Sequence, residues 1–298
     1  MQKVLRVRAP AKINLGLTVL GKRPDGFHEI ESVMQQVSLS DSLLIEPISS
    51  KESLFLCTDP GLLSEENLVW KAAELLAKVT GRRLSGIKIT LFKNIPVAAG
   101  LAGGSSDAAA VLRGLNSYWQ LNLDQETLFE IGARLGSDVP YCLLGGTALA
   151  RGRGEILKKL VPLPHYWVTL VLPAGVKIST ADAYKSFNRE MLGRPSLQKL
   201  LEAINNQDRQ AIENWVAGEL VNTLESAELP GIDSIRKLKT DLRRYGFKPV
   251  LSGSGPTLFM LSENYAGAIS AARLAESLGA DSYLCWTETN SGECFSYA

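Results

Sequence analysis

The chain has 298 residues, of which 45% are hydrophobic, so it can bury a sizeable core and is not a disordered protein. Its 32 basic and 31 acidic side chains leave a net charge of +1, which gives no overall electrostatic reason to bind nucleic acid or an anionic membrane. Only two histidines are present, His28 and His165, which disfavours zinc chemistry and a histidine-based triad. In an enzyme, acid–base work would then fall to Asp, Glu or Lys.

The four cysteines show no C-x-x-C spacing, and a chain of this length needs no disulfide framework, so we expect reduced thiols. No secretory signal is visible, because Met1 leads almost at once into the strand-like run KVLRVRA. The uncharged stretch at 160–176 contains three prolines and predicts a loop followed by a strand instead of a membrane helix. These patterns predict a soluble, cytoplasmic protein.

Short strands are predicted over the first fifty residues. The runs KVLRVRA, AKINLGLTVL, EIESVMQQVSL and SLLIEP alternate or are apolar, and turn residues such as those of GKRPDGFH separate them. The apolar spacing of residues 66–79 predicts a helix that ends at Gly81, and residues 87–92 predict a further strand.

Small residues dominate the segment that follows, and they lead into a predicted helix that ends near Trp119. Asp124 is expected to cap the next helix, whose apolar residues fall on one face. Residues 145–160 are predicted to return to strand, with a hairpin turn at 151–154.

The second half of the chain mixes helices and strands without strict βαβ alternation. Strands are predicted at 166–172, 250–261 and 282–289, and helices near 180–188, 196–205, 208–217, 230–245 and 264–279. No internal repeat or flexible linker is evident. The order of elements predicts an α+β fold of two lobes, residues 1–160 and 161–298, that share a cleft.

The segment PVAAGLAGGSSDAA at 96–109 enters from a strand and leaves into a helix. Its glycines stand among alanines, so the backbone is unshielded and several N–H groups can approach one anion at the helix N-terminus. This composition favours phosphate binding. The alternative is ordinary N-capping by Ser105 or Asp107, which would not explain the glycines Gly100, Gly103 and Gly104.

Three common nucleotide-binding classes are excluded by their missing motifs. The chain contains no G-x-x-x-x-G-K-[ST], which excludes a Walker A loop, and no G-x-G-x-x-G, which excludes a Rossmann fingerprint. It also contains neither H-R-D nor D-F-G, so it is not a protein kinase.

The glycine-rich segment at 96–109 resembles the P-x-x-x-G-L-x-G-S/G-S-x-A-A signature of the GHMP kinase superfamily, which includes galactokinase, homoserine kinase and mevalonate kinase. PAKINLGLTVLGKRPDGFHEIES is similar to the first motif of the superfamily, and VLSGSGPTLF to its C-terminal glycine-rich motif. The doubled glycine in AGGSSDAA, together with LGSDVPYC, narrows the resemblance to the branch that acts on a cytidine diphosphate derivative. The motifs span positions 10 to 259.

The resemblance implies a two-lobed kinase that uses ATP to phosphorylate the 2-hydroxyl of a methylerythritol moiety in non-mevalonate isoprenoid synthesis. Residues 1–160 would be the ATP-binding lobe and residues 161–298 the substrate-side lobe. No direct protein ligand is assigned to the metal, but Mg²⁺ is expected between phosphate oxygens, with a possible contact to Ser106. The resemblance makes the following residues the ATP contacts: Pro96, Val97, Ala98, Ala99, Gly100, Leu101, Ala102, Gly103, Gly104, Ser105 and Ser106.

The resemblance also carries over a catalytic pair. Asp138 would accept the hydroxyl proton as general base, and Lys12 would keep that carboxylate ionised and hold the nucleophilic oxygen. Judged by the residues alone, Asp138 could equally cap a helix ahead of Pro140, and Lys12 could be a solvated charge on an edge strand.

The acceptor side is expected to hold the cytosine. The resemblance places Phe27 and His28 in a turn against the base, with Tyr184 stacked opposite Phe27 and Thr180 in contact with the substrate. Asn14 is a polar residue between apolar strand neighbours, which a hydrogen bond to the substrate would explain. The alternatives are a packed turn residue for His28 and a capping box around Thr180. In the C-terminal motif, Gly253 and Gly255 would let the backbone approach the substrate or would simply form a tight turn.

Other functions remain open on the sequence. A homoserine or mevalonate-type kinase would share the fold but would not need the aromatic and histidine residues around cytosine. A non-catalytic nucleotide sensor with the same fold would not need both Lys12 and Asp138. The expected partner is a small-molecule substrate, with no nucleic acid or membrane, and the chain is expected to be a monomer or a weak homodimer.

Overall fold

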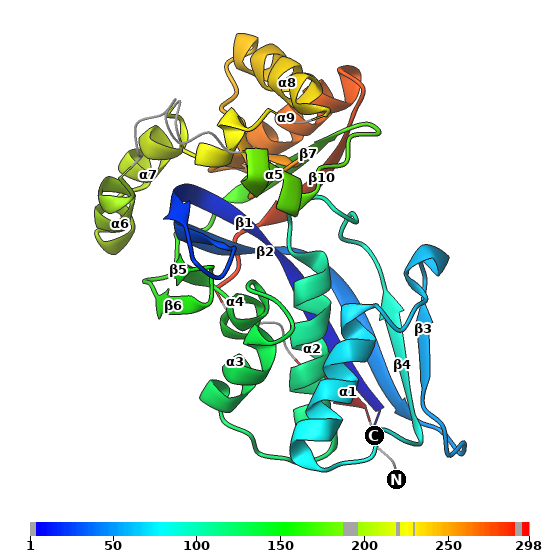
Figure 1. Cartoon of the computed structure of the whole chain (residues 1–298). Helices are drawn as coiled ribbons and strands as arrows, with labels where there is room; N and C mark the ends of the chain where they lie inside the picture. The colour runs from blue at the N-terminus through cyan, green and yellow to red at the C-terminus, as the bar shows by residue number, and fades with distance from the viewer. Residues whose placement is uncertain (1–3, 187–195, 219–220, 229, 290–293, 298) are drawn as a thin grey trace.

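The structure is a computed structural model of the whole chain, and it describes residues 4–186, 196–218, 221–228, 230–289 and 294–297. It confirms the predicted α+β class, with helices packed on two separate sheets in two lobes (Figure 1).

The first two strands are much longer than predicted. β1 (Val4–Lys22) and β2 (His28–Pro47) pair antiparallel along nearly their whole length, where four short runs were predicted. Pro10 does not break β1, because the register shifts between Pro10 and Lys12, and proline is accommodated at such an irregularity. Beyond it, strand alternation turns Lys12 and Asn14 away from the core and toward the cavity described below.

The first sheet combines β1 and β2 with several short strands. Their described order is β11-β1-β2-β4-β3, with β5 beside β2 and β6 beside β5, and the strands are β3 (Leu54–Cys57), β4 (Ile87–Phe92), β5 (Thr147–Gly152), β6 (Ile156–Lys159) and β11 (Cys294–Tyr297). The predicted strand at 87–92 and the hairpin around 151–154 are confirmed. β3 and β11 were not predicted.

A layer of helices covers one face of this sheet. Alanines at 108–110 are fully buried and bring the longest of these helices close to β1. The helix predicted at 66–79 is confirmed, with Gly81 in the left-handed conformation at its end, and Asp124 caps the third helix through the Thr127 N–H as expected. The four helices are α1 (Leu68–Thr80), α2 (Gly103–Tyr118), α3 (Gln125–Ala133) and α4 (Val139–Leu144).

The second sheet is antiparallel, with the order β10-β7-β9-β8, and two amphipathic helices pack on it. Its elements are β7 (Trp167–Pro173), β8 (Val250–Leu251), β9 (Leu258–Ser262), β10 (Ala280–Trp286), α8 (Ile232–Arg244) and α9 (Tyr265–Ser277). The predicted strand at 250–261 is wrong in its middle. Gly253 and Gly255 have φ angles of 56° and 82°, so the chain turns between β8 and β9 instead of remaining extended.

Shorter helices lie in the chain between β7 and β8. The helices predicted near 180, 196 and 208 are confirmed as α5 (Thr180–Ser186), α6 (Gln198–Asn205) and α7 (Arg209–Val216), although positions 187 and 188 lie outside the described residues. The described residues also contain the 3-10 turns η1 (Pro60–Leu62) and η3 (Thr223–Ser226).

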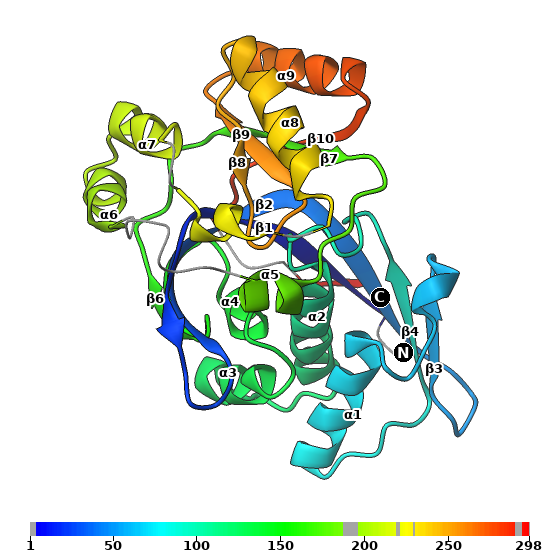
Figure 2. The same ribbon diagram turned by 45° about the horizontal axis from the view of Figure 1, so that its top comes forward.

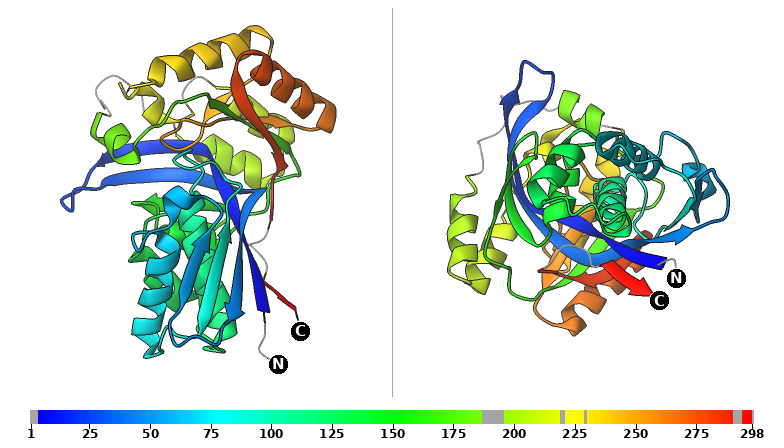
Figure 3. Two further views of the ribbon diagram at one scale, coloured as in Figure 1. Left: turned by 90° about the vertical axis from the view of Figure 1, so that its right-hand side faces the viewer. Right: turned by 90° about the horizontal axis from the view of Figure 1, so that it is seen from below.

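The long β1–β2 pair lies between the two lobes. In the left view of Figure 3 it runs between helices α1–α4 on one side and the second sheet with α8 and α9 on the other. The described chain then returns to the first sheet, where β11 pairs with β1 from Val4 to Val7. The proposed lobe boundary near residue 160 remains a prediction. Within the described chain, no helix has the length and apolar character to cross a membrane.

Candidate active site

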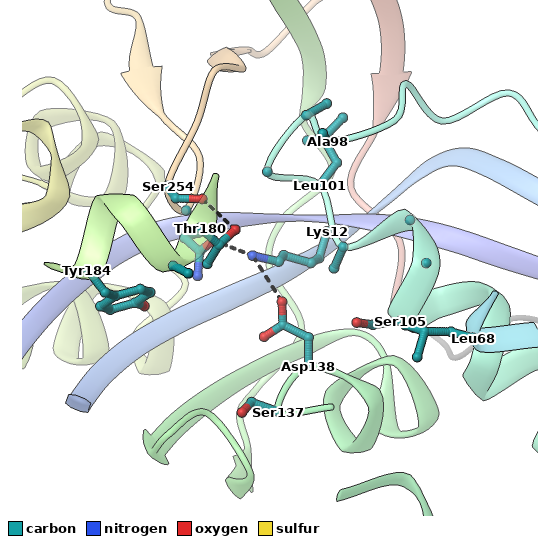
Figure 4. Close-up of a pocket in the computed structure, with 18 of the residues that line it drawn as sticks. Lys12, Leu68, Ala98, Leu101, Ser105, Ser137, Asp138, Thr180, Tyr184 and Ser254 are labelled. Carbon is teal, nitrogen blue, oxygen red and sulfur yellow. Dashed lines mark hydrogen bonds and ion pairs between the residues drawn. The ribbon is translucent and has the colours of Figure 1, made fainter. Parts of the chain in front are cut away.

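A cavity of about 720 Å³ lies between the start of α2, the start of α4, helix α5 and the turn that joins β8 to β9 (Figure 4). Figure 2 shows α5 beside this region, facing the helix layer of the first sheet. The cavity brings together almost all the predicted site residues: Lys12, Asn14, Phe27, His28, residues 96–105, Asp138, Thr180 and Tyr184.

The segment before α2 presents its backbone to the cavity. Ala98, Gly100 and Ala102 have φ angles of 55°, 74° and 56°, so the chain curls tightly just before the helix begins. Ala102 is the N-cap, and no side chain caps α2, so the alternative of capping by Ser105 or Asp107 is wrong. The N–H donors of the first turn and the positive end of the helix dipole are therefore available to an anion.

Ser106 does not line the cavity, contrary to the prediction. Its side chain is buried, its hydroxyl donates to the Pro10 carbonyl at 2.7 Å, and its backbone N–H donates to the Ala102 carbonyl at 2.9 Å. The hydroxyl thus holds α2 against β1, and the N–H closes the first turn of α2. The Ser105 hydroxyl, by contrast, points toward the cavity (Figure 4).

The turn between β8 and β9 holds the glycine-rich segment in shape. Thr257 Oγ1 donates to the Ala99 carbonyl at 2.6 Å, and Ser252 Oγ donates to the Gly100 carbonyl at 3.2 Å. A Cβ atom on Gly100 would lie 2.7 Å from the carbonyl oxygens of Ser252 and Gly255, so only glycine permits this approach. Gly253 and Gly255 form the tight turn given as the alternative, and Gly253 also lines the cavity. An approach of this turn to a substrate stays a prediction.

Lys12 and Asp138 meet inside the cavity, with Lys12 Nζ 3.6 Å from Asp138 Oδ2 (Figure 4). Lys12 is 6% exposed on β1, which excludes a solvated charge. Asp138 occupies the N-cap position of α4 but its side chain makes no capping hydrogen bond, so its carboxylate is left to face the cavity. The pair places a carboxylate next to a fixed ammonium.

Asn14 positions Lys12. Its Oδ1 accepts a hydrogen bond from Lys12 Nζ at 2.7 Å, and its Nδ2 donates to Ser32 Oγ at 2.8 Å. The Ser32 hydroxyl in turn donates to the Gly16 carbonyl at 2.6 Å. This buried chain of hydrogen bonds fixes the ammonium, and it accounts for the polar side chain of Asn14 without a substrate contact.

The aromatic side chains pair differently from the prediction. His28 stacks on Tyr184, with ring centroids 5.3 Å apart and planes at 28°, whereas Phe27 is half exposed and lies under the Arg153 guanidinium, 4.5 Å from its Cζ atom. Burial and the Lys22 ammonium lower the pKa of His28, which favours a neutral imidazole able to donate and to accept. Phe27 and Tyr184 therefore do not form a preformed sandwich.

Helix α5 contributes the Thr180 hydroxyl to the cavity, which His28 and Tyr184 also line. Thr180 Oγ1 lies 2.9 Å from Ser254 Oγ, so the first residue of α5 is tied to the β8–β9 turn. Burial, with a smaller contribution from the nearby Asp138 charge, raises the pKa of Tyr184 well above its usual range, and its phenol stays neutral.

Sequence reasoning missed several residues of the cavity. Arg153 and Lys185 line its acceptor side, and Lys93 lies beneath the glycine-rich segment. Arg153 was predicted only as part of a hairpin turn, directly after Gly152, and nothing local in the sequence indicates that it reaches the cavity. The side of the cavity near α1 was missed as well, because only the fold brings these residues to the glycine-rich segment: Leu62, Asn67 and Leu68.

Lys93 forms a buried cluster with two carboxylates, which we call the Asp41–Lys93–Asp107 cluster. Its ammonium bonds to Asp41 and lies 2.9 Å from Asp107 Oδ2. Asp41 Oδ1 also accepts the N–H groups of Asn94 and Ile95 at 2.6 and 2.8 Å, which fixes the chain entering the glycine-rich segment. Burial alone would lower the pKa of Lys93, but the two carboxylates raise it, so the ammonium stays charged.

Comparison with known proteins shows which family the chain is similar to. Residues 67–146 match the N-terminal domain of GHMP kinases. The chain is 47% identical, over 260 residues, to 4-diphosphocytidyl-2-C-methyl-D-erythritol kinase from Exiguobacterium sibiricum, covering 87% of this chain and 89% of that protein.

Two solved structures are similar as well. A crystal structure of 4-(cytidine 5'-diphospho)-2C-methyl-D-erythritol kinase superimposes with a TM-score of 0.77 at 33% identity, covering 96% of this chain and all of that chain. Homoserine kinase from Cytophaga hutchinsonii has a TM-score of 0.73 at 22% identity, covering 99% of this chain and 98% of that chain, which shows a common fold.

Proposed function

Because the chain belongs to the GHMP kinases, and within them to the family of the 4-diphosphocytidyl-2-C-methyl-D-erythritol kinases, we propose that it transfers the γ-phosphoryl group of ATP to the 2-hydroxyl of 4-diphosphocytidyl-2-C-methyl-D-erythritol in isoprenoid precursor synthesis. One observation carries the proposal. A lysine–aspartate pair, Lys12 and Asp138, lies in the same cavity as the uncapped N-terminus of α2.

Asp138 and Lys12 have different roles in the proposed phosphoryl transfer. Asp138 Oδ accepts the proton of the attacking hydroxyl as the oxygen forms its bond to the γ-phosphorus, and the bond from that phosphorus to the β–γ bridging oxygen breaks to release ADP. Lys12, fixed by Asn14, keeps Asp138 ionised and stabilises the nucleophilic oxygen. Phosphoryl transfer needs mainly positioning and charge stabilisation, which this pair can supply.

The nucleotide phosphates would occupy the start of α2. Residues 97–105 offer backbone N–H groups, and the Ser105 hydroxyl adds a side-chain contact. Mg²⁺ fits this donor set, since it keeps several waters and is commonly held by substrate phosphates with one or two protein oxygens. Within the described chain no three His, Cys, Asp or Glu side chains meet, so Ser105 and Asp138 would be its protein contacts. The ion would neutralise phosphate charge.

The acceptor would lie along His28, Tyr184 and Thr180. Neutral His28 has the hydrogen-bonding pattern to pair with an edge of cytosine, and the aromatic wall would stack on the base. Arg153 and Lys185 carry positive charge on this side, which suits a diphosphate. The stack of His28 on Tyr184 would open, or the base would bind on its outer face, because 5.3 Å leaves no room for a ring between them.

A steady-state assay with ATP and a panel of alcohols tests the function. The panel contains 4-diphosphocytidyl-2-C-methyl-D-erythritol, homoserine, mevalonate and galactose, and we expect the highest kcat/KM by far for the cytidyl compound. A preference for homoserine or mevalonate would replace the substrate assignment. Nucleotide binding without turnover of any alcohol would favour the non-catalytic sensor.

The remaining expectations belong to the same proposal. The enzyme would act in the cytoplasm on a small molecule, without a nucleic-acid or membrane partner, as a monomer or weak homodimer. Sedimentation velocity over a range of protein concentrations measures the last point, and a single dimeric species at every concentration would contradict it.

A further inference from the structure

Asn222 is a buried polar residue that the proposed mechanism does not use. It is 1% exposed and lies outside the cavity lining, at the N-cap of η3, where its Oδ1 accepts the Leu224 N–H at 2.9 Å. Its backbone forms a β-bridge with Leu17 of β1, and the neighbouring Val221 carbonyl accepts the Leu17 N–H at 2.9 Å. Asn222 is therefore anchored to the strand that carries Lys12.

The side-chain amide of Asn222 holds the turn between β8 and β9. Its Nδ2 donates to the Gly253 carbonyl at 2.7 Å and to the Leu251 carbonyl at 2.9 Å, so both of its N–H donors are used. The cap of η3 needs only an oxygen, which a serine would also supply. The two N–H groups have a separate effect, because they fix the start of the turn relative to β1.

Gly253 is the residue through which this turn contacts the site. A Cβ atom on Gly253 would lie 3.3 Å from Asn14 Oδ1 and 3.4 Å from Lys12 Nζ. The same atom would lie 3.3 Å from the carbonyl oxygen of Gly100 in the glycine-rich segment. One backbone position thus packs against Lys12 on one side and against the phosphate-binding loop on the other.

We propose that Asn222 is a positioning residue that acts through Gly253 on both Lys12 and the glycine-rich segment. The inference deepens the proposed function and rests on it for the roles of these two groups. Without the Asn222 donors, two buried carbonyls lose a partner and the turn relaxes. Phosphoryl transfer is sensitive to such a shift, since small displacements of reacting groups lower the rate strongly.

Asn222→Ser tests the proposal. Serine keeps an oxygen for the Leu224 N–H, adds no charge and removes both N–H donors. With 4-diphosphocytidyl-2-C-methyl-D-erythritol as acceptor, we expect kcat at saturating ATP to fall by roughly tenfold. The Kd for a non-hydrolysable ATP analogue, measured by titration calorimetry, should rise by roughly tenfold as well.

A matched control is Asn116→Ser. Asn116 lies near the end of α2, outside the cavity lining, and its amide also bonds to the backbone: Nδ2 donates to the Leu123 carbonyl at 3.1 Å, and Oδ1 accepts the Leu123 N–H at 3.0 Å. This variant should lose Tm and keep the wild-type kcat and Kd. A wild-type kcat or a wild-type Kd in Asn222→Ser would overturn the inference, and so would equal changes in both variants.

Gly253→Ala is a second variant, in case Asn222→Ser does not fold. It adds a methyl group at the contact with Lys12, Asn14 and Gly100 and leaves the Asn222 side chain unchanged. We expect the same fall in kcat and the same rise in Kd, and wild-type values of both would contradict the inference. Absence of turnover by the wild-type protein would instead overturn the proposed function, and the Kd comparison would still test the role of Asn222.

Discussion

Asp138 is the residue on which the proposed chemistry depends most directly. Its carboxylate lies 3.6 Å from Lys12 Nζ, caps no helix and faces the cavity. Replacing it by Asn keeps the size of the side chain and removes its basicity. We expect Asp138→Asn to lower kcat by roughly 10²-fold or more while nucleotide affinity is preserved.

Rapid-mix kinetics and analogue binding on the same preparation separate the two quantities. A near-normal kcat in the variant would remove Asp138 from the mechanism. Lost nucleotide binding would instead mean that Asp138 shapes the site and does not act only on the acceptor.

At the scale of elements, the turn between β8 and β9 supports the glycine-rich segment from the other lobe. Thr257→Val removes the hydroxyl that donates to the Ala99 carbonyl and keeps the branched shape of the side chain. The buried carbonyl loses its better donor, so we expect a loss of about 1–3 kcal/mol in the free energy of unfolding. We also expect KM for ATP to rise by roughly tenfold, equivalent to about 1.4 kcal/mol, with a smaller effect on kcat.

Thr169→Val is the matched control for this prediction. Thr169 Oγ1 also donates to a buried carbonyl, that of Ala268 at 2.9 Å, but it lies between β7 and α9, outside the cavity lining. It should cost similar stability and leave KM for ATP unchanged. An equal rise in KM in both variants would assign the Thr257 effect to general destabilisation.

Helices and short strands could be predicted where residues close in sequence determine where the element begins or ends. The helix ending at Gly81 and the cap at Asp124 follow from residues within one turn of the helix end. The long strand β1 was not predictable in full, because the tolerance of Pro10 depends on a register shift against β2. The turn within 250–261 was predicted only as an alternative, because apolar residues flank its glycines.

The same distinction applies to the site. Motifs were enough to predict Lys12, Asp138 and the glycine-rich segment in one cavity. The stacking of His28 on Tyr184 and the Asp41–Lys93–Asp107 cluster depend on side-chain packing between distant segments. The sequence also hid Asp41, because Ser40 and Ser42 flank it and the three residues together are typical of a turn.

For the whole molecule, burial and then repulsion by Asp41 raise the pKa of Asp107 to about 8, which predicts how stability depends on pH. The folded state holds a proton on Asp107 that the unfolded state has already released, so this contribution to stability is present below about pH 4 and is lost as pH rises through about 8. Asp107→Asn should therefore gain Tm relative to wild type between pH 5 and pH 9. The gain should be a few degrees, since about 1 kcal/mol shifts Tm by roughly 2–4 °C in large domains.

Differential scanning fluorimetry at pH 5, 7 and 9 measures the Tm of both proteins. Subtracting the Tm of the variant from that of the wild type removes the pH dependence that comes from the carboxylates present in both. A Tm difference that is constant across the three pH values would show that the pKa of Asp107 is the same in the folded and the unfolded state.

The bond between Thr257 and Ala99 joins positions 158 residues apart in the chain. Contacts of such long range form late in folding, because the loop between them must be closed before they add stability. The phosphate-binding geometry is thus a property of the completed native state and would not survive in an isolated N-terminal half. Nucleotide binding would consequently act as a sensor of complete folding for this chain, and a saturating nucleotide would stabilise only molecules in which both halves have docked.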